Sequence, residues 1–293
     1  MSDGVPRTVE SIIRLQGAKD TKKDGIEDLP REPIPAAFIP FWENRIVLAS
    51  KLRLNLKPIL CFLGTHGKFP TAEKFGNSSV ITSDDIHLLF KYVLKEPKFS
   101  DITKTVLLEA ILKEKPIDAI VLQESRLGSN EILLLCEILK TNPTIEALVL
   151  TSNNIGDKGV QYIAELLKVN RRINDLALGD NSITDQGMRY LMEAYKENSN
   201  LIELRLEENK ISSQGAGILA IAIASNPNLK LSVLHLRGNP LGDDGLELLL
   251  RALNKKADIT QFNLDIGYNY LSDVSRERLR KFCEDNPKIT VEY

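Results

Sequence analysis

Residues 148–159 read LVLTSNNIGDKG, and the same arrangement returns three more times further along the chain. The later copies are LALGDNSITDQG at 176–187, LRLEENKISSQG at 204–215 and LHLRGNPLGDDG at 234–245. Each copy has leucine at its first and third positions, asparagine at its sixth and glycine at its twelfth. A period of this length indicates a solenoid of stacked structural units.

The full repeat begins three residues before each quoted segment, and one further copy precedes them. The five starts are Ile117, Ile145, Ile173, Leu201 and Leu231, so the spacings are 28, 28, 28 and 30 residues. Apolar residues three and five positions after each start point to one side of a short strand, because side chains alternate along a strand. We therefore predict parallel strands near 119–122, 147–150, 175–178, 203–206 and 233–236.

An asparagine stands where the chain leaves each of the last four strands. Its side-chain amide can satisfy backbone groups of the turn, and asparagines of successive repeats can stack. We expect a buried, hydrogen-bonded ladder of four residues: Asn153, Asn181, Asn209 and Asn239.

The second half of each repeat has the apolar spacing of a helix. Helices are predicted near 130–140, 158–168, 186–196, 214–225 and 244–254. Side chains that can cap their N-termini are Ser129, Asp157, Asp185, Ser213 and Asp243. A glycine follows two residues after each of the last four caps, and there we expect neighbouring repeats to approach too closely for a side chain: Gly159, Gly187, Gly215 and Gly245.

With these motifs, the segment 117–258 resembles the ribonuclease-inhibitor-like class of leucine-rich repeats. The resemblance covers five registered repeats. It implies an α/β solenoid, or horseshoe, with parallel strands on the concave face and helices on the convex face.

Residues 259–293 are interpreted as a final repeat and C-terminal cap. The strand column continues at Ile259, Phe262 and Leu264. The next asparagine, Asn269, then comes two residues late, which predicts a two-residue insertion between Leu264 and Asn269. A helix is predicted over 273–285, followed by a last strand at Ile289, Val291 and Tyr293.

The N-terminal part departs from the repeat pattern. Residues 1–35 are charged and contain four prolines, so we expect a flexible arm. Residues 36–116 are interpreted as an N-terminal cap with degenerate repeats, interrupted by a loop insertion at 64–79. Helices are predicted to begin near Asp84 and at Asp101.

Composition excludes several classes of function. The net charge is -2, which gives no field that would attract nucleic acid. No apolar run approaches the roughly 20 residues that span a bilayer, so no membrane is expected. Three scattered cysteines, Cys61, Cys136 and Cys283, predict reduced thiols in a cytoplasmic protein.

Motifs for catalysis and for cofactors fail on their spacing. The segment Gly64–Lys68 has glycines and a lysine, but Phe62 and Phe69 stand where a phosphate-binding loop needs glycine and serine or threonine. The histidines show no metal-ligand spacing: His66, His87 and His235. We expect no enzyme activity, no cofactor and no metal.

The predicted concave surface is more informative. Its exposed positions come two, four and six residues after each repeat start. Early repeats place small apolar residues there: Ala119, Val121, Ala147, Val149 and Ala177. Later repeats place a charged cluster on or beside this surface, which is our candidate partner site: Asp175, Glu203, Arg205, Glu207, Glu208, His235 and Arg237. The alternative is an ordinary solvated face whose charges neutralise one another, with small residues that reflect only tight curvature or a covering N-terminal arm.

The pattern favours a non-catalytic scaffold or adaptor that binds a protein partner, because solenoids present extended rigid surfaces. Two alternatives stay open by resemblance. Ribonuclease-inhibitor-like repeats occur in regulators of enzymes, such as Ran GTPase-activating proteins and ribonuclease inhibitors, although the inhibitors are rich in cysteine and this chain is not. Such repeats also occur in cytoskeletal and ciliary assemblies. The cytoplasm is the expected location, with the nucleus as an alternative.

Overall fold

The computed structural model describes residues 83–95, 97, 99–114, 116–197, 200–226, 230–256 and 261–293. The predicted arm 1–35, the loop 64–79 and the segment Gly64–Lys68 lie outside the described residues. The chain divides into two compact units, 1–117 and 118–293.

Two helices are described in the first unit, α5 (Ser83–Lys95) and α6 (Asp101–Glu114). Both were predicted near these positions. The Ser100 hydroxyl accepts a hydrogen bond from the Thr103 N–H in the first turn of α6, as an N-cap residue does. The buried side chains of these helices follow helical spacing and include Ile86, Leu89, Phe90, Val93, Leu94, Leu107, Leu108 and Ile111.

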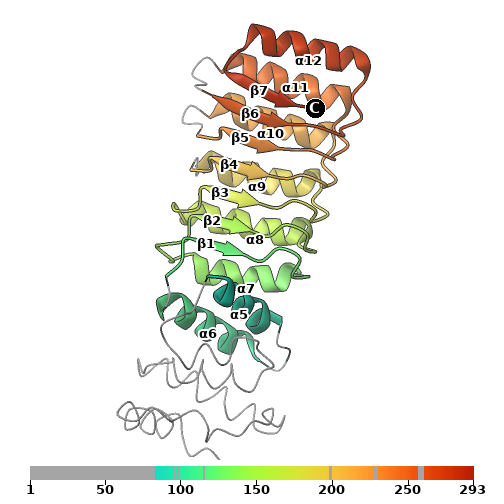
Figure 1. The fold of residues 1–293 in the computed structure, drawn as a ribbon. Coiled ribbons are helices and arrows are strands. Elements are labelled where there is room, and N and C mark those ends of the chain that lie inside the picture. The colour runs from blue at the N-terminus through green and yellow to red at the C-terminus, as the bar shows by residue number, and fades with distance from the viewer. Residues whose placement is uncertain are drawn as a thin grey trace, which may run out of the picture. The chain divides into compact units, whose positions relative to one another are not determined.

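The second unit is an α/β solenoid in which strands and helices alternate (Figure 1). Its seven parallel strands pair in chain order. The strands are β1 (Ala119–Val121), β2 (Ala147–Val149), β3 (Asp175–Ala177), β4 (Glu203–Arg205), β5 (Val233–His235), β6 (Phe262–Asp265) and β7 (Ile289–Glu292). The helices are α7 (Ser129–Leu139), α8 (Gly156–Val169), α9 (Asp185–Glu197), α10 (Ser213–Ser225), α11 (Gly242–Lys255) and α12 (Asp273–Asp285).

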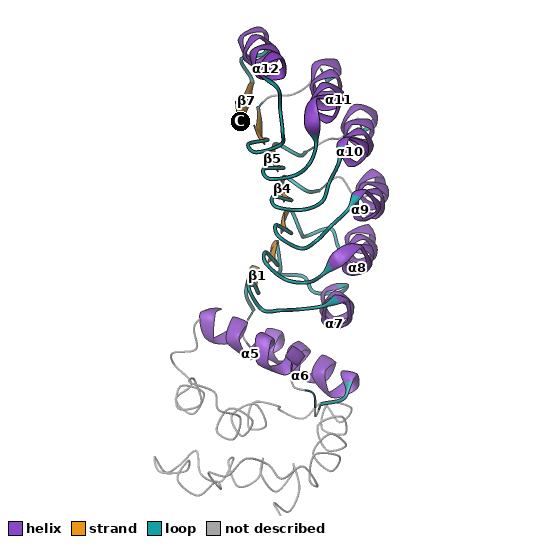
Figure 2. Ribbon diagram, turned by 90° about the vertical axis from the view of Figure 1, so that its right-hand side faces the viewer, coloured by secondary structure: helices purple, strands orange, loops and turns teal. Residues whose placement is uncertain are grey.

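Figure 2 shows the helices of this unit along the outer side of a curve and the strands along its inner side. The predicted leucine-rich-repeat architecture, with strands concave and helices convex, is therefore confirmed. Each of the five predicted strands is one residue shorter than expected at its C-terminal end.

One leucine column shows how the repeats hold together. Leu148, Leu176, Leu204, Leu234 and Leu264 pair in register across five strands, and each is at most 2% exposed. Full burial of a leucine side chain contributes about 1.5–3 kcal/mol. Because every repeat buries this residue against the next repeat, the last one needs a cap. α12 supplies it, with Leu279 buried beneath an otherwise charged helix.

The register of the last repeat corrects one prediction. Leu264 pairs with Leu234, and Asn269 lies beside the preceding turn, where its Nδ2 donates to the Leu236 carbonyl at 2.9 Å. Thirty residues separate Leu234 from Leu264 and also separate Asn239 from Asn269. The predicted insertion between Leu264 and Asn269 is therefore wrong, because the two extra residues precede the strand. The apolar spacing alone could not reveal this, since it fits two registers.

The helix starts bring a second correction. The aspartates predicted as caps do not cap their own helices. Asp157 Oδ1 accepts from the Thr184 N–H at 2.8 Å and from the Gly187 N–H at 3.0 Å, both at the start of α9. Asp185 binds Ser212 in the same way at the start of α10. Each carboxylate therefore satisfies free N–H groups of the next helix, where those donors would otherwise lack a partner.

This arrangement explains the glycine column. A Cβ atom on Gly187 would lie 2.6 Å from Asp157 Oδ1 and 2.7 Å from Ile183 Cγ2, so the predicted close approach is confirmed. Where Ser213 replaces the aspartate, the next helix instead begins with Gly242, whose φ is 62°. Two kinds of contact therefore join the starts of successive helices. Where one helix start carries Asp, the next carries Thr or Ser, which binds that carboxylate; where it carries Ser213, the next begins with glycine.

Candidate functional site

The asparagine ladder fixes the turns that follow the concave strands. Asn209 Oδ1 accepts from the Asn181 N–H at 3.0 Å and from the Ile183 N–H at 2.9 Å. Its Nδ2 donates to the carbonyls of Leu178 and Leu206, each at 3.0 Å. One side chain thus joins two consecutive turns, which keeps the concave surface rigid from repeat to repeat.

The other ladder residues make the same kind of bonds. Asn181 and Asn239 are buried, whereas Asn153, which we expected to be buried, is only half-buried. Its Oδ1 still accepts from the Leu127 N–H at 2.9 Å. Asn269, which is absent from the four-residue ladder predicted from sequence, is buried and extends it by one repeat.

The residue before each ladder asparagine has a left-handed backbone, and so does Glu124, which precedes Ser125 at the same position of the first repeat. The φ angle lies between 50° and 69° at Glu124, Ser152, Asp180, Glu208, Gly238 and Tyr268. This conformation costs a residue with a Cβ atom about 1–2 kcal/mol. The ladder bonds on either side hold the turn in this conformation whatever residue occupies the position.

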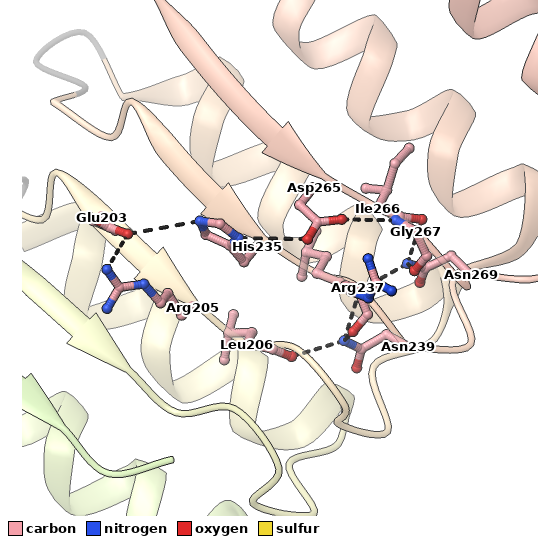
Figure 3. Close-up of polar contacts among 11 residues, drawn as sticks. Glu203, Arg205, Leu206, His235, Arg237, Asn239, Asp265, Ile266, Gly267 and Asn269 are labelled. Carbon is pink, nitrogen blue, oxygen red and sulfur yellow. Dashed lines mark hydrogen bonds and ion pairs between the residues drawn. The ribbon is translucent and has the colours of Figure 1, made fainter. Parts of the chain in front are cut away.

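The concave face carries a network of charged and histidine side chains across β3, β4, β5 and β6. Figure 3 shows the part of it that runs from Arg205 and Glu203 through His235 to Asp265. Arg205 lies 2.5 Å from Glu203 and 3.5 Å from Asp175, measured between nitrogen and oxygen. His235 lies between two carboxylates, with Nε2 3.8 Å from Glu203 and Nδ1 3.7 Å from Asp265. The structure therefore brings together four of the predicted site residues and adds Asp265.

Asp265 was left out of the predicted cluster, although it lies on the concave surface in either register, because a shift of two residues keeps a side chain on the same face of a strand. The observed pairing sets Asp265 opposite His235 on the neighbouring strand. The correct register could have been found by aligning Asn269 with Asn239, since the ladder requires these residues to stack.

Burial raises the pKa of the Asp175 carboxyl above its ordinary value. Arg205 acts in the opposite direction, and the nearby Glu203 carboxylate raises the pKa further. Ionised Asp175 is therefore disfavoured by folding even though Arg205 is beside it. Shifted carboxyl groups of this kind are common at functional sites, so Asp175 stays a candidate site residue.

The remaining predicted residues lie beside the network rather than in it. Arg237 is exposed, and its guanidinium carbon lies 4.4 Å from the centroid of the Tyr268 ring. Glu207 leans over Gly179, where a Cβ atom would lie 2.8 Å from its carboxylate carbon. Glu208 is exposed in the turn that follows β4.

Two exposed tyrosines beside this surface were missed from sequence. Tyr268 is 73% exposed and Tyr270 is 82% exposed, and both have φ angles of 57°. In the preceding repeat the same positions hold Gly238 and Pro240. Comparison of these columns across repeats is the signal that could have found them.

The other end of the concave face matches its predicted chemistry. Small apolar residues on β1 to β3 are half-buried or buried: Ala119, Val121, Ala147, Val149 and Ala177.

Burial raises the pKa of the Cys136 thiol, which belongs to the helical layer. Within the described ranges, no group of three or more His, Cys, Asp and Glu side chains could hold a metal ion. Among the helices described, none has the length and the apolar composition of a membrane span.

The comparison with sequence families bears on this unit. A sequence model described as Leucine Rich repeat matches residues 141–164, 169–192 and 228–250, which contain β2, β3 and β5 with the starts of the helices that follow. Leucine-rich repeats are therefore present. The comparison with curated proteins gave no match. Among solved structures, the chain is similar to Leiomodin-1 Actin-Binding Site 2 (ABS2), with 16% identity and a TM-score of 0.42, over 71% of this chain and 100% of that chain.

Proposed function

We propose that this chain is a non-catalytic interaction scaffold of the cytoplasm, built from ribonuclease-inhibitor-like repeats. The 28- to 30-residue period with a full helix in each described repeat supports that class. The proposed partner-binding surface is the C-terminal half of the concave face: Asp175, Glu203, Arg205, Glu207, Glu208, His235 and Arg237. The partner is a protein, since a rigid concave sheet presents an extended surface.

The ionic network across four strands is the observation that carries this proposal. A solvated face whose charges merely cancel would have balanced signs. Here Arg205 is shared by two carboxylates, and His235 carries charge only when protonated. The surface therefore keeps an excess of negative charge, which can attract and orient a partner.

Quantitative capture of the partner on the full-length chain tests the proposal. We expect Arg205→Ala and Arg237→Ala each to weaken the complex by about 2 kcal/mol, roughly thirtyfold, as arginine hot spots do. Although each change removes a positive charge, Arg205 orients the Glu203 carboxylate and Arg237 packs against the Tyr268 ring. Thermal stability should change little, because partly exposed ion pairs contribute about 0–1 kcal/mol. Arg189→Ala on the outer helix α9 is the matched control, since Arg189 is exposed on the opposite layer.

Wild-type affinity in both concave variants would contradict the proposed surface. A regulator of an enzyme and a subunit of a cytoskeletal assembly would both act by binding a partner. Identification of the captured protein by mass spectrometry distinguishes these two roles from that of a soluble adaptor.

A further inference from the structure

The charge around the concave network is unbalanced in one direction. Five carboxylates stand on or beside the C-terminal half of this face, against two arginines: Asp175, Glu203, Glu207, Glu208 and Asp265. The register also sets Asp265 beside Glu292 of β7, so two acidic residues occupy adjacent strands at this end. Like charges at such positions repel one another unless a cation lies between them.

Glu207 and Arg237 stand at the same position of consecutive repeats but do not pair. Their backbones are neighbours, since the Glu208 N–H donates to the Arg237 carbonyl at 2.8 Å. Glu207 turns toward Gly179, and Arg237 turns the other way, where its Nη1 would lie 3.5 Å from a Cβ on Gly267. Among the described residues, none donates a hydrogen bond to Glu207 Oε2, which is buried in this position. A buried carboxylate oxygen without a donor is unfavourable, so Glu207 gains by meeting a cation.

Two exposed tyrosines, Tyr268 and Tyr270, follow β6 at this end of the sheet. The Arg237 guanidinium over the Tyr268 ring shows that a cation already lies against an aromatic face at this edge. Tyr270 offers a second ring that is 82% exposed and is held by a left-handed backbone. Exposed tyrosines beside arginine have the composition of an interface hot spot.

We propose that the acidic C-terminal half of the concave face, with Glu207 after β4, Asp265 on β6, and Tyr268 and Tyr270 after β6, binds a basic, arginine- or lysine-rich segment of the protein partner. The proposal rests on the function proposed above and adds the chemistry of the partner. Cationic side chains of the segment stack on Tyr270 and draw the Glu207 carboxylate away from Gly179. The excess of carboxylates steers the segment to this half of the concave face and disfavours an acidic or phosphate-bearing one.

A fluorescein-labelled oligoarginine peptide is the probe, with an oligoglutamate peptide for comparison, in fluorescence anisotropy with the full-length chain. We expect the oligoarginine to bind and the oligoglutamate not to bind. Glu207→Gln and Tyr270→Ala should each raise the Kd for oligoarginine by about threefold. Gly179→Ala should lower it by about twofold, because the new Cβ displaces the Glu207 carboxylate into the concave face.

Matched changes on the helical layer control for general attraction to a polycation. Glu193→Gln on α9 removes the same charge as Glu207→Gln, and Tyr162→Ala on α8 removes a tyrosine ring, which lies against Lys158. Both should bind oligoarginine as wild type does. The double variant Gly179→Ala with Glu207→Gln should lose the gain of the single glycine change.

Three results would overturn the proposal: no binding of oligoarginine, equal weakening by the control variants, or binding of oligoglutamate. If the native partner is still lost on Arg205→Ala while oligoarginine fails to bind, the scaffold function stands and the basic segment is wrong. Thermal melts of every variant establish that changes in Kd do not arise from unfolding.

Discussion

Asp185 begins α9, yet its carboxylate caps α10 through Ser212. Oδ1 accepts from the Ser212 N–H at 2.8 Å, and Oδ2 accepts from the Ser212 hydroxyl at 2.6 Å. The Ser212 hydroxyl in turn accepts from the Gln214 N–H at 3.1 Å. The free end of each such helix is therefore satisfied by the repeat before it, so capping couples neighbouring units as well as stabilising single helices.

Replacement of Asp185 by alanine should lower the free energy of unfolding by about 1 kcal/mol, since two acceptors at a helix start are lost. Ser213→Ala is the control, because Ser213 holds the same position one repeat later, where the following junction uses Gly242. Urea denaturation should show a loss for the first variant and little change for the second. An equal loss of stability in the two variants would mean that the Asp185 carboxylate does not stabilise the start of α10.

The asparagine ladder predicts a difference between two chemically identical substitutions. Asn209→Ala should cost about 1–3 kcal/mol, because it leaves buried backbone donors and carbonyls without partners. Asn153→Ala should cost less, because Asn153 is only half-buried and water can replace its amide. The measurement is the midpoint of thermal unfolding for the two variants. A larger loss for Asn153 would contradict the role of burial.

Asp243 predicts a pH dependence. The Ser272 backbone N–H holds the pKa of this carboxyl below its ordinary value, with further bonds from the Ser272 and Ser275 hydroxyls. Because the pKa is lowered in the folded state, the stabilisation is present above the unfolded-state pKa and is lost as the pH falls through the folded-state pKa. The difference in stability between wild type and Asp243→Asn should therefore shrink from neutral pH to pH about 3. Denaturant titrations at the two pH values check this, and a constant difference would contradict it.

Asp175 predicts the opposite pH dependence of stability. Burial raises its pKa, so ionisation opposes folding above the folded-state pKa, and this cost disappears as the pH falls below the unfolded-state value. Asp175→Asn should therefore be at least as stable as wild type at neutral pH, and the difference should fade in acid. Calorimetry of wild type and Asp175→Asn at neutral pH and at pH about 3 measures this difference in stability. A less stable variant at neutral pH would show that the contact with Arg205 serves the fold rather than a partner.

The repeat period and the apolar columns determined the architecture from sequence alone. Leu148 and its equivalents recur at fixed spacing, and each must be buried against the next, so only a parallel stack satisfies all of them. The strand residues that face outward between the leucines follow from the alternation of side chains. For this reason Glu203, Arg205 and His235 could be assigned to one surface without coordinates.

Contacts between repeats decided the rest. The spacing of apolar residues permits two registers near Phe262, and only the pairing of Leu264 with Leu234 selects one and brings Asp265 to His235. Whether an aspartate at a helix start caps its own helix or the next depends on the distance between repeats, which no single repeat encodes. The Glu207 and Arg237 side chains point in opposite directions, which likewise depends on the space that Gly179 and Gly267 leave in other repeats. The sequence by itself determined the stack of repeats and its two faces. The tertiary structure decided which side chains meet between repeats, because those contacts join residues about 30 positions apart and only packing sets their geometry.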